Sequence, residues 1–480
     1  MSEFAVLMPG FAGPALPRWI EDALCDGLAG VCLFGSNVES PDQLRALTDT
    51  IYAANPRAVV AIDEEGGDVT RLYRLEGSPF PGNAVLGRLS DVSATSSVAE
   101  QVGWELRRAG VGLALAPDLD VNSNPNNPVI GVRSFGANAA LVSAHAAAWV
   151  RGIQSTGVAA SAKHFPGHGD TALDSHVSAP AVHASQAELR ARELPPFQAA
   201  IVAGVATVMT SHVVFPAFDP SRPATFSRRI LHGLLREELG FEGVVVSDAL
   251  DMVAASGTLG EGKAAASALA AGCDLLCLGS VTTESAFEQI LAALGQATVD
   301  GQLEPERLAD ATDRVARLGD TLRRSREQVK VPADVEAGVV PGVDDVRVAQ
   351  TFRVSDRARD LLALRASRGA PLAWVKLNPD ANVAVGTLPW GPFAAGIEPV
   401  AVIEPGHDAP AGLPDGALVI VVGKDNHRFG WARAAIDELR SRGEVIAVDM
   451  GWPDPDYAYA DIATYGASRL VGAALLRLIG

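Results

Sequence analysis

Short apolar runs alternate with longer amphipathic stretches over the first two-thirds of the chain. Each run is nearly all apolar, a pattern typical of parallel β-strands that are buried on both faces. The stretches between the runs have the spacing of amphipathic helices. We therefore expect eight strands, at residues 4–9, 30–34, 58–62, 111–116, 158–162, 205–210, 243–247 and 273–278.

This order of strands and helices predicts an α/β fold. Eight successive units of one strand and one helix, over residues 1–327, are typical of a (β/α)8 TIM-type barrel. A doubly wound open sheet has the same alternation and is the alternative fold. The number of strands favours the barrel.

A smaller α/β C-terminal domain is expected after the barrel. A long helix is predicted at 303–327, and residues 328–347 are rich in proline, glycine, valine and acidic residues without a clear period, which is typical of a linker. Residues 348–480 contain further strand-like runs with a helix-like run between two of them. These runs lie at 372–377, 400–403, 417–423 and 445–451. The polar segment 423–427 is either a functional loop or an ordinary turn.

The composition narrows the classes of partner. Hydrophobic residues make up 48% of the 480 residues and charged residues 20%, as in globular proteins. The net charge of -18 predicts no nucleic-acid partner and no anionic membrane partner, because few cations remain to neutralise phosphates. The sequence shows no CxxC pair, no signal-peptide pattern and no apolar run of membrane-spanning length. We expect a cytoplasmic protein that uses no metal and no other cofactor.

Charged and polar residues follow five of the predicted strands. In a (β/α)8 barrel the carboxyl ends of all strands meet at one rim, where catalytic residues gather. One such residue is easily explained as a loop cap, but five sets on one rim indicate a site. The five sets are Asp63-Glu64-Glu65, Asp118 with Asp120, Lys163-His164, Ser211-His212 and Ser247-Asp248.

The segment 163–176, KHFPGHGDTALDSH, is the densest in titratable groups. One interpretation is a metal site, but the spacing of the possible ligands matches no common zinc motif. These ligands are His164, His168, Asp170, Asp174 and His176. The other is acid/base catalysis, in which Asp174 lies two residues before His176 and orients its ring, as the aspartate does in a hydrolytic triad. The residues alone leave both interpretations open.

Five segments, taken in order, closely resemble the bacterial β-N-acetylglucosaminidases of glycoside hydrolase family 3. The block KHFPGHG followed by DSH is the most specific of them, and the resemblance covers about residues 1–325. Residues 348–480 resemble, more loosely, the second domain of the two-domain members. At Asp68 the family more often has a basic or apolar residue. The five segments are AIDEEGGDVTRL (61–72), NNPVIGVRSFG (126–136), AKHFPGHGDTALDSH (162–176), TVMTSHVVFPAFDP (207–220) and GFEGVVVSDALDM (240–252).

The resemblance implies a role for each matching residue. Asp248 matches the nucleophile that forms a covalent glycosyl-enzyme, His176 matches the general acid/base, and Asp174 matches its partner. The residues that match the sugar-binding positions are Asp63, Arg71, Arg133, Lys163 and His164. By position alone, Asp248 is also explained as a helix cap, Arg133 as a member of a structural ion pair, and His212 as a buried histidine bonded to backbone.

The resemblance implies a retaining exo-β-N-acetylglucosaminidase that releases terminal β-linked N-acetylglucosamine from muropeptides or chitin fragments. A histidine that has donated its proton is neutral and does not repel an anion, so inorganic phosphate is an alternative acceptor to water. A phosphorylase is therefore the main alternative. A metal-dependent hydrolase and a sugar-binding protein without activity are weaker alternatives.

Overall fold

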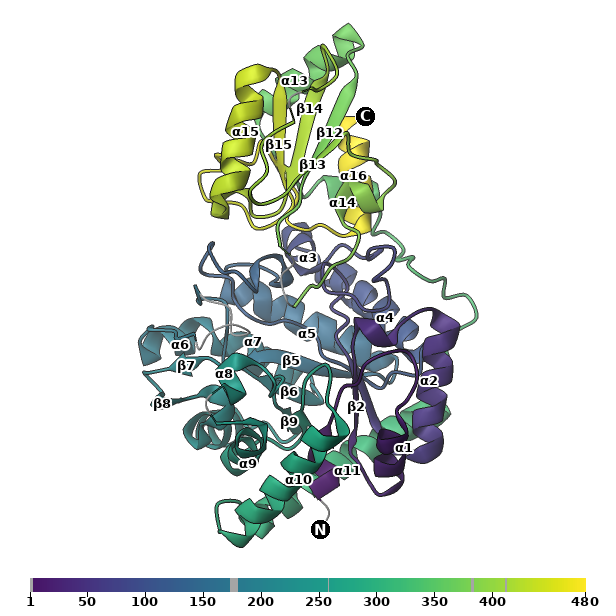
Figure 1. Cartoon of the computed structure of the whole chain (residues 1–480), viewed down its shortest axis with the longest axis vertical. Helices are drawn as coiled ribbons and strands as arrows, with labels where there is room; N and C mark the ends of the chain where they lie inside the picture. The colour runs from purple at the N-terminus through teal and green to yellow at the C-terminus, as the bar shows by residue number, and fades with distance from the viewer. Residues whose placement is uncertain (1–2, 173–179, 258, 381–383, 411) are drawn as a thin grey trace.

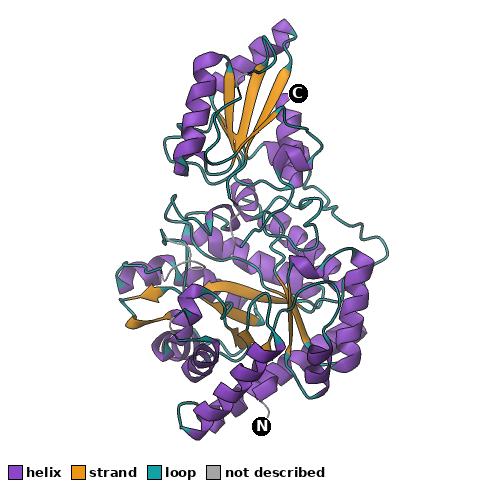
Figure 2. Ribbon diagram, in the orientation of Figure 1, coloured by secondary structure: helices purple, strands orange, loops and turns teal. Residues whose placement is uncertain are grey.

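The computed structural model describes residues 3–172, 180–257, 259–380, 384–410 and 412–480. The first part contains eight short parallel strands that follow one another in chain order. They lie at the centre of the lower part of the molecule in Figures 1 and 2. They are β1 (Leu7–Met8), β2 (Gly30–Leu33), β3 (Val59–Ile62), β4 (Leu113–Ala114), β5 (Ala159–Phe165), β6 (Thr207–Thr210), β9 (Val244–Val246) and β10 (Leu276–Cys277).

Hydrogen bonds between neighbouring strands close this sheet into a ring. Strands β2, β3, β4, β5, β6 and β9 pair in that order, and β1 pairs with β10. A bridge between Val246 and Leu275 joins β9 to β10, and Cys32 N donates to Pro9 O at 3.0 Å, which joins β2 to β1. Every predicted strand of the barrel overlaps an observed strand, so the predicted (β/α)8 fold class is confirmed.

Helices surround the ring and connect its strands (Figure 2). Several begin at a side-chain cap, such as Ser40, Asp91 and Asn138, whose oxygen accepts a backbone N–H of the first turn. The α-helices are α1 (Arg18–Cys25), α2 (Pro41–Ala54), α3 (Asn83–Leu89), α4 (Val92–Arg108), α5 (Ala139–Ser155), α6 (Gln186–Arg192), α7 (Leu194–Val202), α8 (Val253–Ser256), α9 (Glu261–Ala271), α10 (Glu284–Val299) and α11 (Pro305–Gln328). This part also contains a π-helix, η5 (Arg229–Glu238), and a hairpin of β7 (Val214–Phe215) and β8 (Asp219–Pro223).

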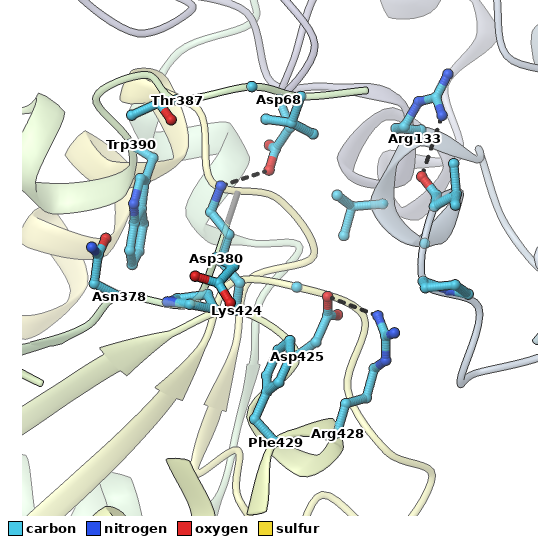
Figure 3. Close-up of a pocket in the computed structure, with 18 of the residues that line it drawn as sticks. Asp68, Arg133, Asn378, Asp380, Thr387, Trp390, Lys424, Asp425, Arg428 and Phe429 are labelled. Atoms are coloured by element: carbon cyan, nitrogen blue, oxygen red, sulfur yellow. Dashed lines mark hydrogen bonds and ion pairs between the residues drawn. The ribbon is translucent and has the colours of Figure 1, made fainter. Parts of the chain in front are cut away.

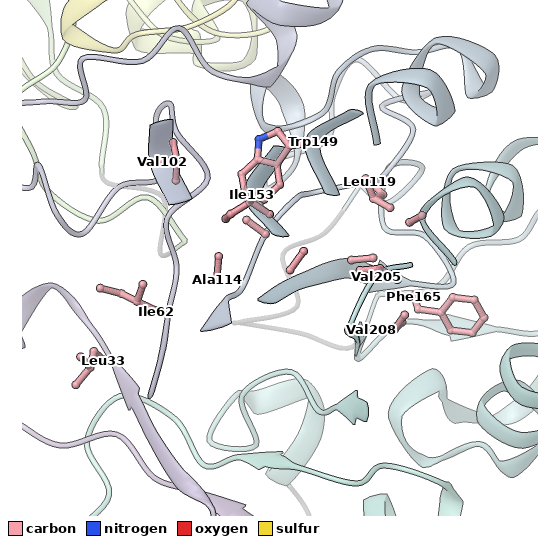
Figure 4. Close-up of a cluster of buried hydrophobic side chains, with 14 of the residues drawn as sticks. Leu33, Ile62, Val102, Ala114, Leu119, Trp149, Ile153, Phe165, Val205 and Val208 are labelled. Carbon is pink, nitrogen blue, oxygen red and sulfur yellow. The ribbon is translucent and has the colours of Figure 1, made fainter. Parts of the chain in front are cut away.

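Side chains of the strands alternate between two apolar layers. Val59 and Leu113 pack inside the ring, whereas Val60 and Ala114 pack outward against the helices. Figure 4 shows part of the outer layer, including Ala114. Leu318 and Leu322 of α11 join the inner layer, and a Cβ on Gly112, just before β4, would lie 3.3 Å from Leu322. Helix α11 therefore covers the amino ends of the strands, which leaves their carboxyl ends for a site.

The C-terminal α/β unit contains a second, mostly parallel sheet in the order β11-β16-β15-β14-β12-β13. Four of its six strands lie in predicted runs; the two-residue strands β11 and β16 are too short for a periodic signal. Its strands are β11 (Arg353–Val354), β12 (Leu372–Leu377), β13 (Ala401–Ile403), β14 (Leu418–Gly423), β15 (Val445–Asp449) and β16 (Ile462–Ala463). Its helices are α12 (Asp345–Ala349), α13 (Asp356–Arg368), α14 (Gly391–Ala394), α15 (Gly430–Arg442) and α16 (Arg469–Ile479).

This unit packs on the barrel near α3, at the end where the strands of the ring finish (Figure 1). Arg88 of α3 donates to Thr351 O at 2.7 Å, and Arg469 N donates to Ser78 O at 2.9 Å. Asp68 accepts a hydrogen bond from Ala467 N at 2.8 Å. The C-terminal unit therefore contacts the barrel at the end where the barrel strands finish. Among the described residues, no helix is both long and apolar enough to span a bilayer.

Candidate active site

A cavity of about 210 Å³ opens at the carboxyl ends of the barrel strands. Its polar wall combines residues that follow different strands, as expected for a barrel. Asp63 follows β3, Asp248 follows β9, and Lys163 and His164 lie in β5 itself. The sequence placed the end of this strand at residue 162, but β5 continues to Phe165 because its carbonyl accepts Ser211 N at 2.9 Å.

A compact charge network forms one wall of this cavity. Lys163 Nζ lies 2.8 Å from Asp63 Oδ1 and 2.8 Å from Glu65 Oε1. Glu65 also accepts two hydrogen bonds from Arg133, at 3.0 Å and 2.8 Å. Lys163, Glu65 and Arg133 are almost fully buried, and the bidentate contact between Arg133 and Glu65 fixes the positions of both side chains.

The network also fixes the charges of its members. Burial by itself lowers the pKa of Lys163, but Asp63 and Glu65 raise it overall. Burial by itself raises the pKa of Glu65, but Arg133 and Lys163 hold it well below its usual range. Lys163 therefore remains a cation and Glu65 an anion at neutral pH.

Arg71 contacts both Asp63 of the barrel and the backbone of the C-terminal unit. Its guanidinium lies 3.5 Å from Asp63 and donates to the carbonyl oxygens of Ala384 and Val385 at 2.8 Å and 3.2 Å. The buried carboxylate of Glu64 accepts Arg71 N at 2.8 Å and so holds this segment in place. The C-terminal unit therefore contributes backbone to the wall of the site.

His164 and His168 lie beside two buried aspartates. His164 Nδ1 is 2.7 Å from Asp120, which also accepts His168 N at 2.6 Å. Burial lowers the pKa of both histidines to about 4, so both rings are neutral at pH 7. Burial raises the pKa of Asp120, and the contact between this carboxyl group and Nδ1 sets which ring nitrogen of His164 faces the cavity as donor or acceptor.

Asp118, Asp120 and His164 are also candidate metal ligands, with ligand atoms within 4.8 Å of one another. Asp120 and His164 are hydrogen-bonded to each other, whereas Asp118 Oδ2 accepts no hydrogen bond among the described residues and has only an ion-pair contact. Arg133 places a cation 3.5 Å from Asp118. The donor set therefore fits a positioning network better than a metal site. It differs from the set considered from the sequence, which lay within 164–176.

Asp248 lies at the turn that follows β9. Ala249 N donates to its Oδ1 at 2.8 Å, and His212 Nε2 lies 3.0 Å from Ala249 O, which anchors the turn. The next helix, α8, begins only at Val253, and Met252 precedes it as the cap residue. Asp248 therefore does not cap the next helix, and that interpretation is wrong. His212 is a buried histidine bonded to backbone, as the sequence predicted for it.

The segment after β5 is anchored on both sides of residues 173–179. Asn127 donates to His168 O at 2.8 Å, and Pro180 O accepts Val214 N at 2.9 Å. At Gly169 a Cβ would lie 1.9 Å from Val121 O, so only glycine permits this close approach. Asp174 and His176, the predicted acid/base pair, lie outside the described residues.

The cavity thus brings together six of the eight predicted site residues. These are Asp63, Arg71, Arg133, Lys163, His164 and Asp248. The sequence assigned no role to Glu65, although its position two residues after Asp63 places both on one side of an extended segment, a signal that could have identified it. His168 was noted only as a metal ligand, and the contact with Ala384 has no signal in the sequence.

Comparison with known proteins agrees with this geometry. Residues 17–318 match the model of the glycosyl hydrolase family 3 N terminal domain. The chain is 38% identical over 333 residues to a beta-hexosaminidase from Stenotrophomonas maltophilia, covering 67% of this chain and 98% of the relative. It is 36% identical over 330 residues to beta-hexosaminidase A from Pseudoalteromonas piscicida, covering 63% of this chain; the matched part spans 55% of that longer relative.

A solved structure extends the similarity to both sheets. A glycoside hydrolase family 3 beta-N-acetylglucosaminidase from Paenibacillus sp. str. FPU-7 superposes with a TM-score of 0.83 at 29% identity. That match covers 100% of this chain and 96% of the other. The family model alone accounts for more than half of the sequence. The chain therefore belongs to glycosyl hydrolase family 3.

Proposed function

We propose that this chain is a retaining exo-β-N-acetylglucosaminidase that releases terminal β-linked N-acetylglucosamine. The observation that carries the proposal is the single cavity shared by Asp248, Asp63, Lys163 and His164. A carboxylate beside several sugar-binding groups is what a glycosidase nucleophile requires. The names of the beta-hexosaminidase relatives and of the Paenibacillus enzyme support this choice of substrate.

In the proposed mechanism, Asp248 attacks the anomeric carbon and the bond to the leaving oxygen breaks. Protonated His176 donates its proton to that oxygen as the glycosyl-aspartate forms. Neutral His176 then removes a proton from water, which attacks the anomeric carbon and frees Asp248. The ordinary imidazole pKa of about 6.5 suits both steps. Asp174 orients the ring and stabilises its charged form.

The charge network positions the sugar in this mechanism. Asp63 offers a carboxylate and Lys163 an ammonium group to adjacent sugar hydroxyls, and both are fixed by their mutual contact of 2.8 Å. Arg71 contacts Asp63, and Arg133 holds Glu65, which in turn contacts Lys163. Neutral His164 adds a further hydrogen-bonding group. Groups held in advance do not have to be ordered when the substrate binds.

The test is incubation with an aryl β-N-acetylglucosaminide, in the presence and absence of inorganic phosphate and of EDTA. We expect free N-acetylglucosamine, first released as the β-anomer, at a rate that neither addition changes. If sugar 1-phosphate is the product, the reaction is phosphorolysis and not hydrolysis. Loss of activity in EDTA would indicate the metal-dependent alternative, and an α-anomer would exclude a retaining mechanism.

A further inference from the structure

The cavity that contains Asp248 is rich in sulfur as well as in charge. Two cysteines and two methionines line it, which is four of the nine such residues in the whole chain. They are Cys32, Cys277, Met209 and Met252. Thiol and thioether sulfur atoms are soft ligands, which prefer soft metal ions to magnesium or calcium. This part of the wall therefore has a chemistry that the sugar-binding groups do not use.

The larger cavity between the barrel and the C-terminal unit has no such wall. It has a volume of about 680 Å³, and its described lining residues include neither cysteine nor methionine (Figure 3). Lys424, from the polar segment 423–427, pairs there with Asp68 at 3.4 Å and so joins the two units. The concentration of sulfur is thus a feature of the cavity of Asp248.

Cys32 and Cys277 meet inside the ring of strands. Cys32 lies in β2 and Cys277 in β10, and both are buried in the inner apolar layer with Met8 of the intervening strand β1. Met8 is the partner of Cys277 in the register of β1 with β10. The two thiols are hydrogen-bonded to each other. They therefore form a sulfur pair that faces the cavity.

The spacing of the strands disfavours a disulfide between these cysteines. Neighbouring strands lie about 4.8 Å apart, so the Cα atoms of residues two strands apart are separated by roughly 9 Å. A disulfide requires a separation of less than about 7 Å. A metal ion between the sulfur atoms replaces one S–S bond of about 2 Å by two metal–sulfur bonds of about 2.3 Å each. The pair is therefore better suited to hold a metal ion than to oxidise.

The protonation of Cys32 also favours metal binding over other thiol chemistry. The hydrogen bond with Cys277, followed by burial, raises the pKa of the Cys32 thiol well above its usual range, and the charge of Asp63 adds to this effect. Cys32 is therefore a thiol at neutral pH and a poor nucleophile. A soft metal ion still binds such a group, because the metal–thiolate bond offsets the loss of the proton.

The backbone of Cys277 is held on the turn that carries Asp248. Cys277 N donates to Ser247 Oγ at 3.0 Å, and Leu250 N donates to Cys277 O at 2.9 Å. These contacts lie on either side of Asp248 in the sequence. The position of the thiol is thus fixed in advance, and an ion bound to it would lie in the cavity that Asp248 lines.

We propose that Cys32 and Cys277 bind a monovalent d10 cation, the class of Cu+ and Ag+, and that the bound ion excludes the sugar from the cavity. Thiolates with neighbouring thioethers suit this class, whereas a structural zinc ion takes four ligands. Each S–H bond is replaced by a sulfur–metal bond, and its proton passes to solvent. The ion is thus an inhibitor and not a cofactor. Only the inhibition rests on the proposed function, because the binding of the ion does not require catalysis.

The test is calorimetric titration of silver nitrate, in chloride-free buffer, into Cys25→Ser protein, which lacks the exposed thiol. We expect one silver ion per chain, with hydrolysis of an aryl N-acetylglucosaminide lost in proportion to the bound silver. In the same background, Cys32→Ala and Cys277→Ala should each weaken silver binding at least about 100-fold, more than the loss of an outer partner of a metal site costs. Cys273→Ala is the matched control, because Cys273 is buried but does not line the cavity.

A second measurement does not depend on the folding of the alanine variants. Saturating N-acetylglucosamine should weaken silver binding to the Cys25→Ser protein, because sugar and ion compete for one cavity. An absence of bound silver, unchanged binding after Cys32→Ala and Cys277→Ala, or full activity with silver bound would overturn the proposal, as would binding that the sugar does not affect. If the aryl glycoside is not cleaved, the proposed function fails, whereas silver binding that needs both cysteines would still establish the metal site.

Discussion

The charge network of Glu65, Lys163 and Arg133 gives a prediction whose size follows from the structure. Glu65 contacts both cations at 2.8 Å, and the side chains of all three are 5% exposed or less. Glu65→Gln keeps the shape and removes the charge. Removing one partner of a buried ion pair costs about 3–5 kcal/mol, because the remaining charges stay buried.

This cost is large enough to measure by calorimetry. For a cooperative unit of about 320 residues, a loss of 3–5 kcal/mol lowers the unfolding midpoint by roughly 4–7 °C. Lys163 also loses one of its two anionic partners, so its pKa falls and it binds the sugar less strongly. We therefore expect kcat/KM on an aryl N-acetylglucosaminide to fall at least about tenfold, with an earlier decline at alkaline pH.

The matched control is Glu288→Gln, an exposed glutamate on α10. It should change neither the unfolding midpoint nor kcat/KM. A Glu65→Gln protein that unfolds within about 1 °C of the unmodified protein and retains its full kcat/KM would refute the reasoning, because the network would then hold neither the fold nor the sugar-binding groups.

The remaining predictions concern four other residues. Asp248→Ala should abolish turnover of aryl N-acetylglucosaminides, and His176→Ala should slow poor leaving groups far more than activated ones; equal slowing would contradict the acid/base role. Arg71→Met, which removes the contacts with Asp63 and Ala384, should raise KM about tenfold in steady-state assays. Burial raises the pKa of Glu193 from 4.5 to about 7, so the folded state binds more protons and loses stability as pH rises through this range. Glu193→Gln should therefore gain up to about 3 kcal/mol relative to the unmodified protein between pH 4.5 and 7, measured by urea unfolding.

The sequence was sufficient for the barrel strands because each is a buried, nearly continuous apolar run. Val59–Ile62 and Val244–Val246 pack on both faces, so their composition identifies them without tertiary information. Strand β8, Asp219–Pro223, contains two prolines and three polar residues and has no such pattern. Its pairing with β7 depends on tertiary contacts, which local residues do not reveal.

The site was predictable where its residues follow strands and not where they meet across the fold. Asp63, Lys163 and Asp248 were identified because the carboxyl ends of barrel strands converge. The contact of Arg71 with Ala384 joins residues 313 positions apart, and no local pattern encodes it. The same holds for the pairing of Lys424 with Asp68 across 356 positions. The role of the C-terminal unit at the site could therefore come only from the structure.

The central claim is that Asp248 forms a covalent bond to the sugar. The most direct measurement is treatment with 5-fluoro-β-N-acetylglucosaminyl fluoride, which forms a glycosyl-enzyme that hydrolyses slowly, followed by peptide mass spectrometry. Our account predicts one fluorinated N-acetylglucosaminyl group on the peptide that contains Asp248, and no label in the Asp248→Ala protein. A label on another residue, or rapid turnover of the reagent by the Asp248→Ala protein, would contradict it.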